Sequence, residues 1–201
     1  MTSAVGAAPA IAVVPVPNEL GSPAFFLART PVTNAEYAPA VADGAVPAPP
    51  WWDDPDFRGP LRPVVGVSWD DAGAYCAWLT RTAGGAWRLP TEAEWERAAS
   101  GGLGRPRTSW GDAVPEGEIP DGPLGGPWET GHGNPNPYGL YDIGTIVHEW
   151  CLDWRRPGRR ASRGGSWRHA IRWSSPSASS SLPPSFRYSD YGFRPLREVF
   201  G

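Results

Sequence analysis

The sequence predicts a mixed α+β domain with unusually little regular secondary structure. Three capped helix starts are followed by scattered short runs typical of strands. The 201 residues include 25 glycines and 25 prolines, yet also 12 Trp, 6 Tyr and 6 Phe. Because disordered chains are poor in aromatic residues, this composition favours an ordered core joined by long connections.

The helices are expected in the first half of the chain. Each begins after a Ser or Thr that has an acidic residue three positions later, which is the capping-box pattern. The pairs are Thr33 with Glu36, Ser68 with Asp71, and Thr91 with Glu94. The second helix should bury one stripe, because apolar side chains recur at i, i+3, i+4 and i+7. That stripe consists of Ala72, Tyr75, Cys76 and Leu79.

Strands are expected near both ends of the chain. Residues 1–10 are expected to be a flexible lead-in to one domain over 11–201, whose first strands fall at 11–16 and 24–29. Residues 44–63 and 103–137 are rich in Pro or Gly and are expected to be loops. Later strands are expected around 147–150, 163–167 and 192–196. Between the last two, residues 168–191 contain eight serines and no sustained periodicity.

Charge and hydropathy argue against several partners. All 18 basic residues are arginine, and the formal net charge of −3 gives no global attraction to nucleic acid. The arginine-rich run at 155–160 surrounds Pro157-Gly158 and is expected to be an exposed turn between strands. No segment approaches the ~20 apolar residues that span a bilayer, and residues 1–16 lack the basic start of an export signal. We therefore expect a cytoplasmic protein with no nucleic-acid partner and no membrane segment.

Cysteine and histidine spacing does not indicate a metal site. Cys76 and Cys151 are far apart and are expected to be buried free thiols. The three histidines, His132, His148 and His169, show neither HxxxH nor HExxH spacing. They are therefore expected to be scattered residues on the surface or in hydrogen bonds.

Several segments, taken in order, resemble the formylglycine-generating-enzyme (sulfatase-modifying factor) family. They lie at 31–34, 63–69, 74–78, 88–95, 138–142, 148–151, 163–167 and 192–194, and together cover roughly 11–197. The resemblance implies a C-type-lectin-like fold with sparse secondary structure. Enzymes of this family oxidise a substrate cysteine by using two cysteines of their own. The matching positions here are His169 and Ser174, and neither supplies a thiolate, so oxidase activity by that mechanism is not expected.

The segment at 163–194 resembles another branch of the same fold more closely. That branch consists of the variable proteins of diversity-generating retroelements. In those proteins the region matching residues 163–194 is diversified, and Arg172, Pro184, Arg187 and residues 192–194 resemble its fixed framework. The resemblance implies that the positions between them vary and contact ligand. These are Arg168, His169, Ala170, Trp173, Ala178, Ser180, Ser181, Leu182, Phe186, Tyr188, Ser189 and Asp190.

The residue types in this segment suit an adaptable binding surface. Ser offers adaptable hydrogen bonds, Tyr and Trp offer contact area at low entropic cost, and Trp173 is the expected exposed anchor. The first hypothesis is therefore a non-catalytic protein that binds a protein ligand through this segment. The alternative is a formylglycine-generating-enzyme-like protein with another enzymatic or accessory role.

The same family often carries calcium. The matching loop offers side-chain oxygens from Asp142 and Glu149 and backbone carbonyls from Thr145 and Val147, and a hard cation prefers oxygen ligands. The usual Gly-Asn of this loop is replaced by Thr145-Ile146. Two roles for Glu149 remain open, a calcium ligand or the partner of a neighbouring arginine.

Overall fold

The computed structural model describes residues 9–115, 124–171 and 174–199. Within these ranges the helices are α1 (Asn34–Ala42), α2 (Trp69–Thr82) and α3 (Glu92–Ser100). The strands are β1 (Val13–Pro17), β2 (Pro23–Ala28), β3 (Trp87–Arg88), β4 (His148–Arg156), β5 (Arg159–Arg163), β6 (Ser179–Leu182), β7 (Tyr191–Gly192) and β8 (Leu196–Glu198). Most of the expected lead-in at 1–10 lies outside the described residues.

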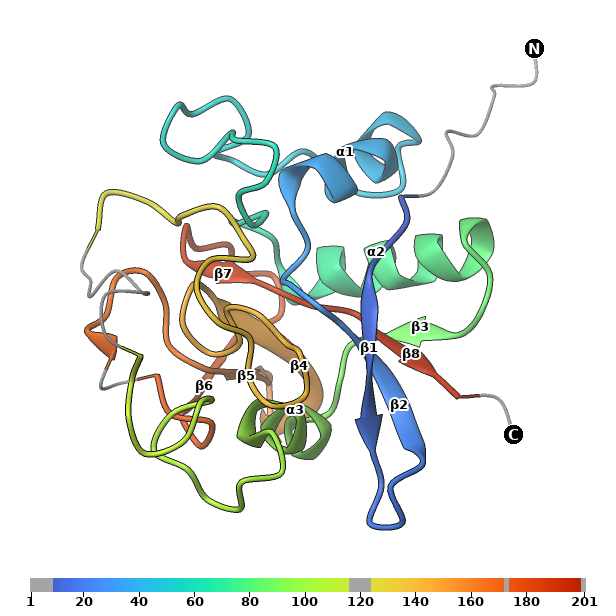
Figure 1. Cartoon of the computed structure of the whole chain (residues 1–201). Helices are drawn as coiled ribbons and strands as arrows, with labels where there is room; N and C mark the ends of the chain where they lie inside the picture. The colour runs from blue at the N-terminus through green and yellow to red at the C-terminus, as the bar shows by residue number, and fades with distance from the viewer. Residues whose placement is uncertain (1–8, 116–123, 172–173, 200–201) are drawn as a thin grey trace.

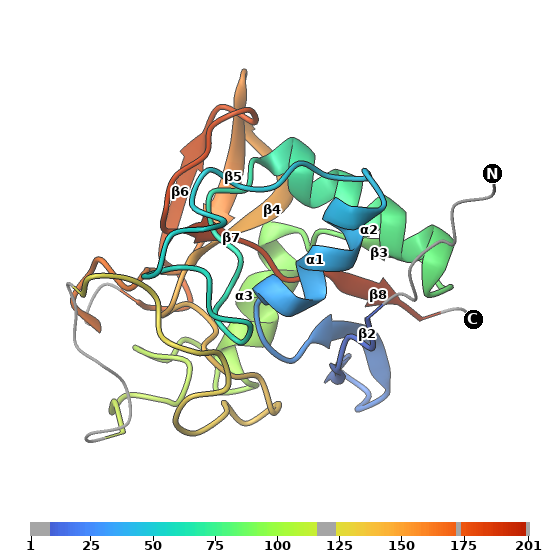
Figure 2. The ribbon, with the colours of Figure 1, turned by 90° about the horizontal axis from the view of Figure 1, so that it is seen from above.

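All three predicted helix starts are confirmed. Thr33, Ser68 and Thr91 are the N-caps, and each forms both hydrogen bonds of a capping box with the acidic residue three positions later. The predicted stripe of α2 is fully buried, since its four members are no more than 2% exposed. Helix α1 lies beside α2, and the stacked rings of Tyr37 and Tyr75, 5.4 Å apart, join the two helices (Figure 2).

The first sheet joins the two ends of the chain. Its order is β1-β2-β8-β3, and all of its pairings are antiparallel. The β1–β2 hairpin comes from the start of the chain, and β8, drawn in red, lies between β2 and β3 (Figure 1). The last strand is therefore interior to the sheet.

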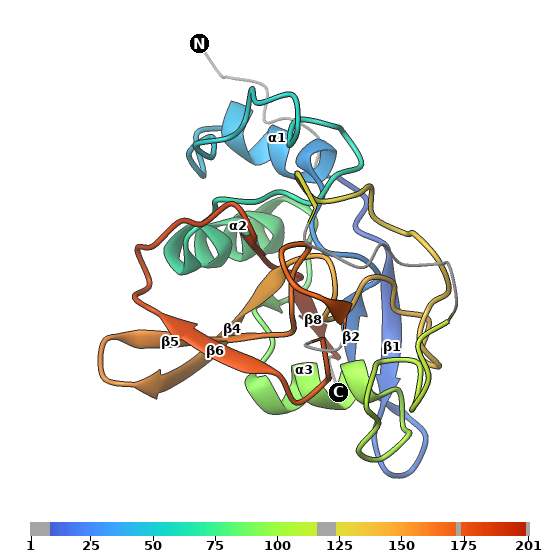
Figure 3. The ribbon, with the colours of Figure 1, turned by 90° about the vertical axis from the view of Figure 1, so that its left-hand side faces the viewer.

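The second sheet carries the segment with the expected binding residues. Its order is β6-β5-β4-β7, in which β7 is parallel to β4 and the other pairs are antiparallel. The predicted turn at Pro157-Gly158 connects β4 to β5. Helices α2 and α3 pack against this sheet and flank it in the view of Figure 3. No helix within the described ranges is long and apolar enough to cross a membrane.

The strand predictions after Tyr138 are only partly right. The segment at 163–167 leaves β5 at Arg163, because Gly164 adopts a φ of +78° and packs on the loop at 144–146. There Gly165 N donates to the Gly144 carbonyl at 2.9 Å, and Trp167 N donates to the Ile146 carbonyl at 3.0 Å. The segment at 192–196 is split between β7 and β8, and β3 and β6 were not predicted.

Candidate functional site

The segment at 168–190 is attached to the rest of the fold by two of its expected framework residues. The Pro184 carbonyl accepts a hydrogen bond from Trp69 N at 2.9 Å, at the start of α2. The Arg187 guanidinium donates to both carboxylate oxygens of Asp71, at 2.9 Å each, in a bidentate pair. Asp71 also belongs to the capping box of α2, so the segment is held to a rigid helix end. Arg172 lies outside the described residues.

Most of the expected binding residues are accessible. The exposed members are Arg168, His169, Phe186 and Tyr188, and the partly exposed members are Ala170, Ala178, Ser180, Ser181 and Leu182. Trp173, the expected anchor, lies outside the described residues.

Ser189 and Asp190 differ from the expectation of a displayed side chain. They are only 4% and 7% exposed. The Ser189 carbonyl accepts from Trp167 Nε1 at 3.3 Å, and the Asp190 carboxylate accepts from the Ser166 hydroxyl at 3.0 Å. Both residues precede β7 directly, and the pairing of β7 with β4 draws them into the fold.

A pocket of about 240 Å³ opens between this segment and the second sheet. His169, Ala178 and Ser180 line it, together with His148 of β4. Elsewhere in the segment, Phe186 and Tyr188 are 42% and 45% exposed, with ring centroids 6.0 Å apart. The expected binding residues thus contribute to a small pocket and provide a pair of exposed aromatic rings.

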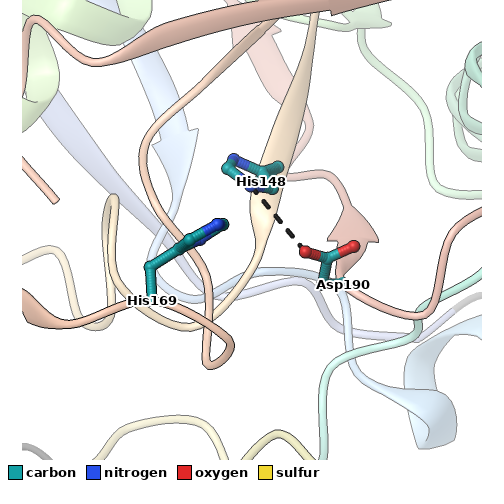
Figure 4. Close-up of side chains that lie close together, drawn as sticks. All are labelled: His148, His169 and Asp190. Atoms are coloured by element: carbon teal, nitrogen blue, oxygen red, sulfur yellow. Dashed lines mark ion pairs between the residues drawn. The ribbon is translucent and has the colours of Figure 1, made fainter. Parts of the chain in front are cut away.

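Two of the histidines that were expected to be scattered lie together with an aspartate. The expected hydrogen-bonding role is present, because His148 Nδ1 bonds to the Gly164 carbonyl and His169 Nδ1 bonds to the Ser166 hydroxyl. One ligand atom each of His148, His169 and Asp190 lies within 4.8 Å of the other two. His148 Nε2 lies 3.8 Å from Asp190 Oδ2, and the His169 ring points toward both (Figure 4). Burial lowers the pKa of His148, and the adjacent Asp190 carboxylate opposes that shift. The sequence does not show this group, because it depends on the parallel register that pairs His148 with Tyr191.

Both thiols are buried, as predicted. Cys76 and Cys151 are free, buried, and part of two different apolar clusters. Burial raises the pKa of Cys76 to about 12 and raises that of Cys151 well above its usual value, so neither is a ready nucleophile. At the two positions matched to the family's oxidising cysteines, His169 is exposed and Ser174 is buried.

The loop expected to hold calcium is occupied by hydrogen-bond donors. Asp142 accepts from Trp128 Nε1 at 2.9 Å and from Gly131 N at 2.6 Å. The Thr145 hydroxyl donates to the Asp142 carbonyl at 3.1 Å, which closes the loop without the usual Gly-Asn, and Val147 is fully buried.

Glu149 pairs with an arginine, the second of the two roles considered for it. Both residues of this pair, Glu149 and Arg194, are 0% exposed. Arg194 Nε donates to Glu149 Oε2 at 2.7 Å and Nη2 donates to Oε1 at 2.9 Å, while Trp95 Nε1 also donates to Oε2 at 2.7 Å. Arg194 further donates to the carbonyls of Ala28, Arg29 and Tyr141. A calcium ion on this carboxylate would lie against a buried guanidinium, so these residues do not fit the ion.

A further exposed surface lies on the β4–β5 hairpin, around the predicted turn at Pro157-Gly158. The Arg160 guanidinium lies between the rings of Trp69 and Trp154, 3.6 and 3.7 Å from their centroids. Trp154 is 55% exposed, the largest exposure of any aromatic side chain in the described ranges. Its position directly before the arginine-rich run at 155–160 was the only available signal.

Known proteins resemble this chain in sequence and in fold. The family model described as "Sulfatase-modifying factor enzyme 1-like domain" matches residues 12–199. A formylglycine-generating enzyme of Thermomonospora curvata is 38% identical over 154 residues, which cover 61% of this chain and 49% of the relative. An inactive C-alpha-formylglycine-generating enzyme 2 of Mus musculus is 43% identical over 124 residues, which cover 52% of this chain and 37% of the relative. The chain thus spans at most about half the length of these curated relatives.

A solved structure matches nearly the whole chain. Treponema denticola variable protein 1 superposes with a TM-score of 0.75 and 23% identity over 99% of each chain. At this identity the likeness shows the shared fold, and it confirms the predicted C-type-lectin-like architecture with little regular secondary structure.

Proposed function

This chain belongs to the sulfatase-modifying factor enzyme 1-like domain family, and on that premise we propose that it is a non-catalytic binding domain. Its ligand, which we propose is a protein, contacts the accessible side chains of the segment at 168–190. The rest of the domain is the fixed scaffold that holds this segment.

The proposal depends on one observation: some side chains of the segment are attached to the scaffold, and others are accessible. Pro184 and Arg187 are attached to the start of α2, and Phe193 and Arg194, just beyond the segment, are fully buried. The positions between these anchors include exposed Phe186 and Tyr188. A segment fixed at its anchors can change its accessible side chains without changing its path, because surface substitutions seldom alter stability by more than ~0.5 kcal/mol.

The chemistry of the accessible positions also supports binding. Exposed aromatic rings and arginine provide most of the affinity at protein interfaces, and serine provides adaptable hydrogen bonds. The segment offers Phe186, Tyr188 and Arg168 as exposed residues, beside the partly exposed Ser180 and Ser181. The similar fold of a protein named as variable supports the same proposal.

Two matched libraries of the full chain test the scaffold. In the first library the nine accessible positions are randomised, and in the second Trp167, Arg187, Phe193 and Arg194 are randomised. Protease resistance of each displayed variant reports folding. We expect most members of the first library and few of the second to resist proteolysis. Equal loss of folding in both libraries would contradict the proposal, because the segment would then be part of the core.

Natural variation provides the second test. The coding sequence for residues 163–194 should differ among closely related isolates at the accessible positions, while Pro184, Arg187 and residues 192–194 stay constant. A segment without variation would instead favour a single dedicated ligand or substrate.

The alternative function is an enzymatic role within the same family. The buried positions of Cys76 and Cys151 argue against cysteine oxidation, because a thiol must be accessible and ionisable to react. A cysteine-containing peptide incubated with the full chain, copper and oxygen should keep its thiol, as measured by mass spectrometry. Conversion of that cysteine to an aldehyde would establish the enzymatic alternative.

A further inference from the structure

We infer that His148, His169 and Asp190 form a binding site for one divalent transition-metal ion of the zinc class. The three residues come from different parts of the chain, namely β4, the turn after Trp167, and the residue before β7. One ligand atom from each lies within 4.8 Å of the others. Figure 4 shows the three side chains converging. The inference meets the proposed function at one position, because His169 is also one of the accessible residues of the segment. A metal ligand at this position should stay constant while the other accessible positions vary.

The hydrogen bonds of both imidazole rings leave a nitrogen lone pair free for a metal. His148 Nδ1 lies 2.7 Å from the Gly164 carbonyl, which can only accept, so the ring is protonated at Nδ1 and its lone pair is on Nε2. That Nε2 atom faces Asp190 Oδ2 at 3.8 Å. A carbonyl bound to the opposite ring nitrogen is the arrangement that orients histidine ligands in metalloproteins.

Ser166 fixes the second ring in the same way. Its hydroxyl lies 3.0 Å from Asp190 Oδ2 and 3.0 Å from His169 Nδ1. The single hydroxyl proton is donated to the carboxylate, so Oγ accepts a proton from His169 Nδ1 and leaves the lone pair on His169 Nε2. Ser166 is 1% exposed and cannot readily reorient, so one buried side chain orients two of the three ligands.

The charge and the accessibility of the group suit a cation. Asp190 is 7% exposed, and within the described ranges its ion-pair partner is His148 rather than an arginine. A buried carboxylate without a strong cationic partner is costly, and a bound metal ion would compensate its charge. The pocket of about 240 Å³ beside His148 and His169 provides an entry path and space for a further ligand.

The donor set indicates which ion binds. Two imidazole nitrogens and one carboxylate oxygen form the set found in open zinc sites and related transition-metal sites, whereas calcium and magnesium prefer oxygen alone. Ligand atoms of a tetrahedral ion about 2.1 Å away lie about 3.4 Å apart, so the group must contract by up to about 1.4 Å from its present separation of up to 4.8 Å. His169 lies on an exposed turn and can make that movement. The pocket beside His148 and His169 would give water or a donor atom of a bound ligand access to the remaining coordination position.

Titration of the metal-free full chain with Zn²⁺ by calorimetry, and with Co²⁺ by visible absorption, tests the inference. We expect one ion per chain and the absorption bands of a tetrahedral Co²⁺ site with nitrogen and oxygen ligands. His169→Ala should weaken binding by at least ~100-fold, and Ser166→Ala by ~10-fold through loss of orientation. His132→Ala, at an exposed histidine outside the group, is the matched control and should not change the affinity.

His169→Cys separates coordination from a structural role. A thiolate is also a zinc ligand, so this variant should recover tight binding and give the intense sulfur-to-Co²⁺ absorption absent from the parent chain. Asp190→Asn keeps the shape of the side chain and should weaken binding without the thiol signal. Equal affinities of the parent, His169→Ala and His132→Ala chains would overturn the inference and leave His148 and Asp190 as a structural contact. The library experiment measures folding without added metal, so its outcome does not depend on that result.

Discussion

Replacing Glu149 by glutamine should destabilise the domain more than almost any other change that conserves side-chain volume. The carboxylate receives two hydrogen bonds from Arg194 and one from Trp95, and neither residue of the pair is exposed. Glutamine keeps the shape but removes the charge, so the guanidinium is left buried with three backbone carbonyls as its partners. Leaving one member of a buried pair unpaired costs about 3–5 kcal/mol.

The expected shift in melting temperature follows from the size of the domain. A loss of 1 kcal/mol lowers the Tm of a domain of this length by about 2–4 °C, so Glu149→Gln should lower it by about 6–20 °C. Thermal unfolding followed by circular dichroism, together with urea unfolding, measures both quantities. Glu198→Gln is the matched control, because Glu198 forms an ion pair with Arg88 but is 46% exposed. That control should cost less than about 1 kcal/mol.

The double variant Glu149→Gln with Arg194→Met provides a stricter test. If the cost of the first change is mainly an uncompensated charge, removing the guanidinium as well should recover part of the stability. Recovery should be incomplete, because the carbonyls of Ala28, Arg29 and Tyr141 then lose their donor. A Glu149→Gln chain that melts with the parent would refute the reasoning and show that the pair does not hold the segments together.

Three further outcomes are expected. Gly164→Ala should lower the free energy of unfolding in urea by at least ~1 kcal/mol more than Gly158→Ala. Both glycines have positive φ, but only a Cβ at Gly164 would meet another atom closely, Gly144 Cα at 2.5 Å. Equal losses would contradict the close packing of the two loops. Both cysteines should resist a thiol reagent in the native chain and react after unfolding, and rapid labelling of the native chain would argue against their burial. Because burial raises the pKa of Cys76 from 9.0 to about 12, the contribution of this residue to stability should be complete below pH 9 and should decline between pH 9 and 12. Millimolar calcium should leave the Tm unchanged, since the oxygens of Asp142 and Glu149 already accept hydrogen bonds, whereas an increase removed by a chelator would establish the calcium site.

The helices could be predicted from the sequence because their signals are local. A capping box needs only a hydroxyl and a carboxylate three residues apart, and Thr33, Ser68 and Thr91 each provide it. The short strands lack such a signal. β6 is the sequence Ser-Ser-Ser-Leu, with no alternation of apolar and polar residues, and it is a strand only because β5 pairs with it.

The candidate site was predictable only where a motif carried it. The match to known segments placed the accessible residues between Arg168 and Tyr188 on one continuous stretch of chain. It could not show that Asp190 turns inward, because that follows from the pairing of β7 with β4. The histidine group was missed for the same reason, since His148 and His169 are brought together by sheet register and a turn rather than by spacing.

The position of β8 inside the first sheet also has a consequence during synthesis. β2 and β3 emerge early from the ribosome, but the strand that bridges them comes from residues 196–198. A chain that stops or shifts frame within residues 168–190 lacks this bridge, the Phe193 side chain and the partner of Glu149. Such a product cannot complete either sheet and is left to proteolysis. A variant of the exposed segment therefore folds only if its reading frame and length still place residues 191–198 correctly.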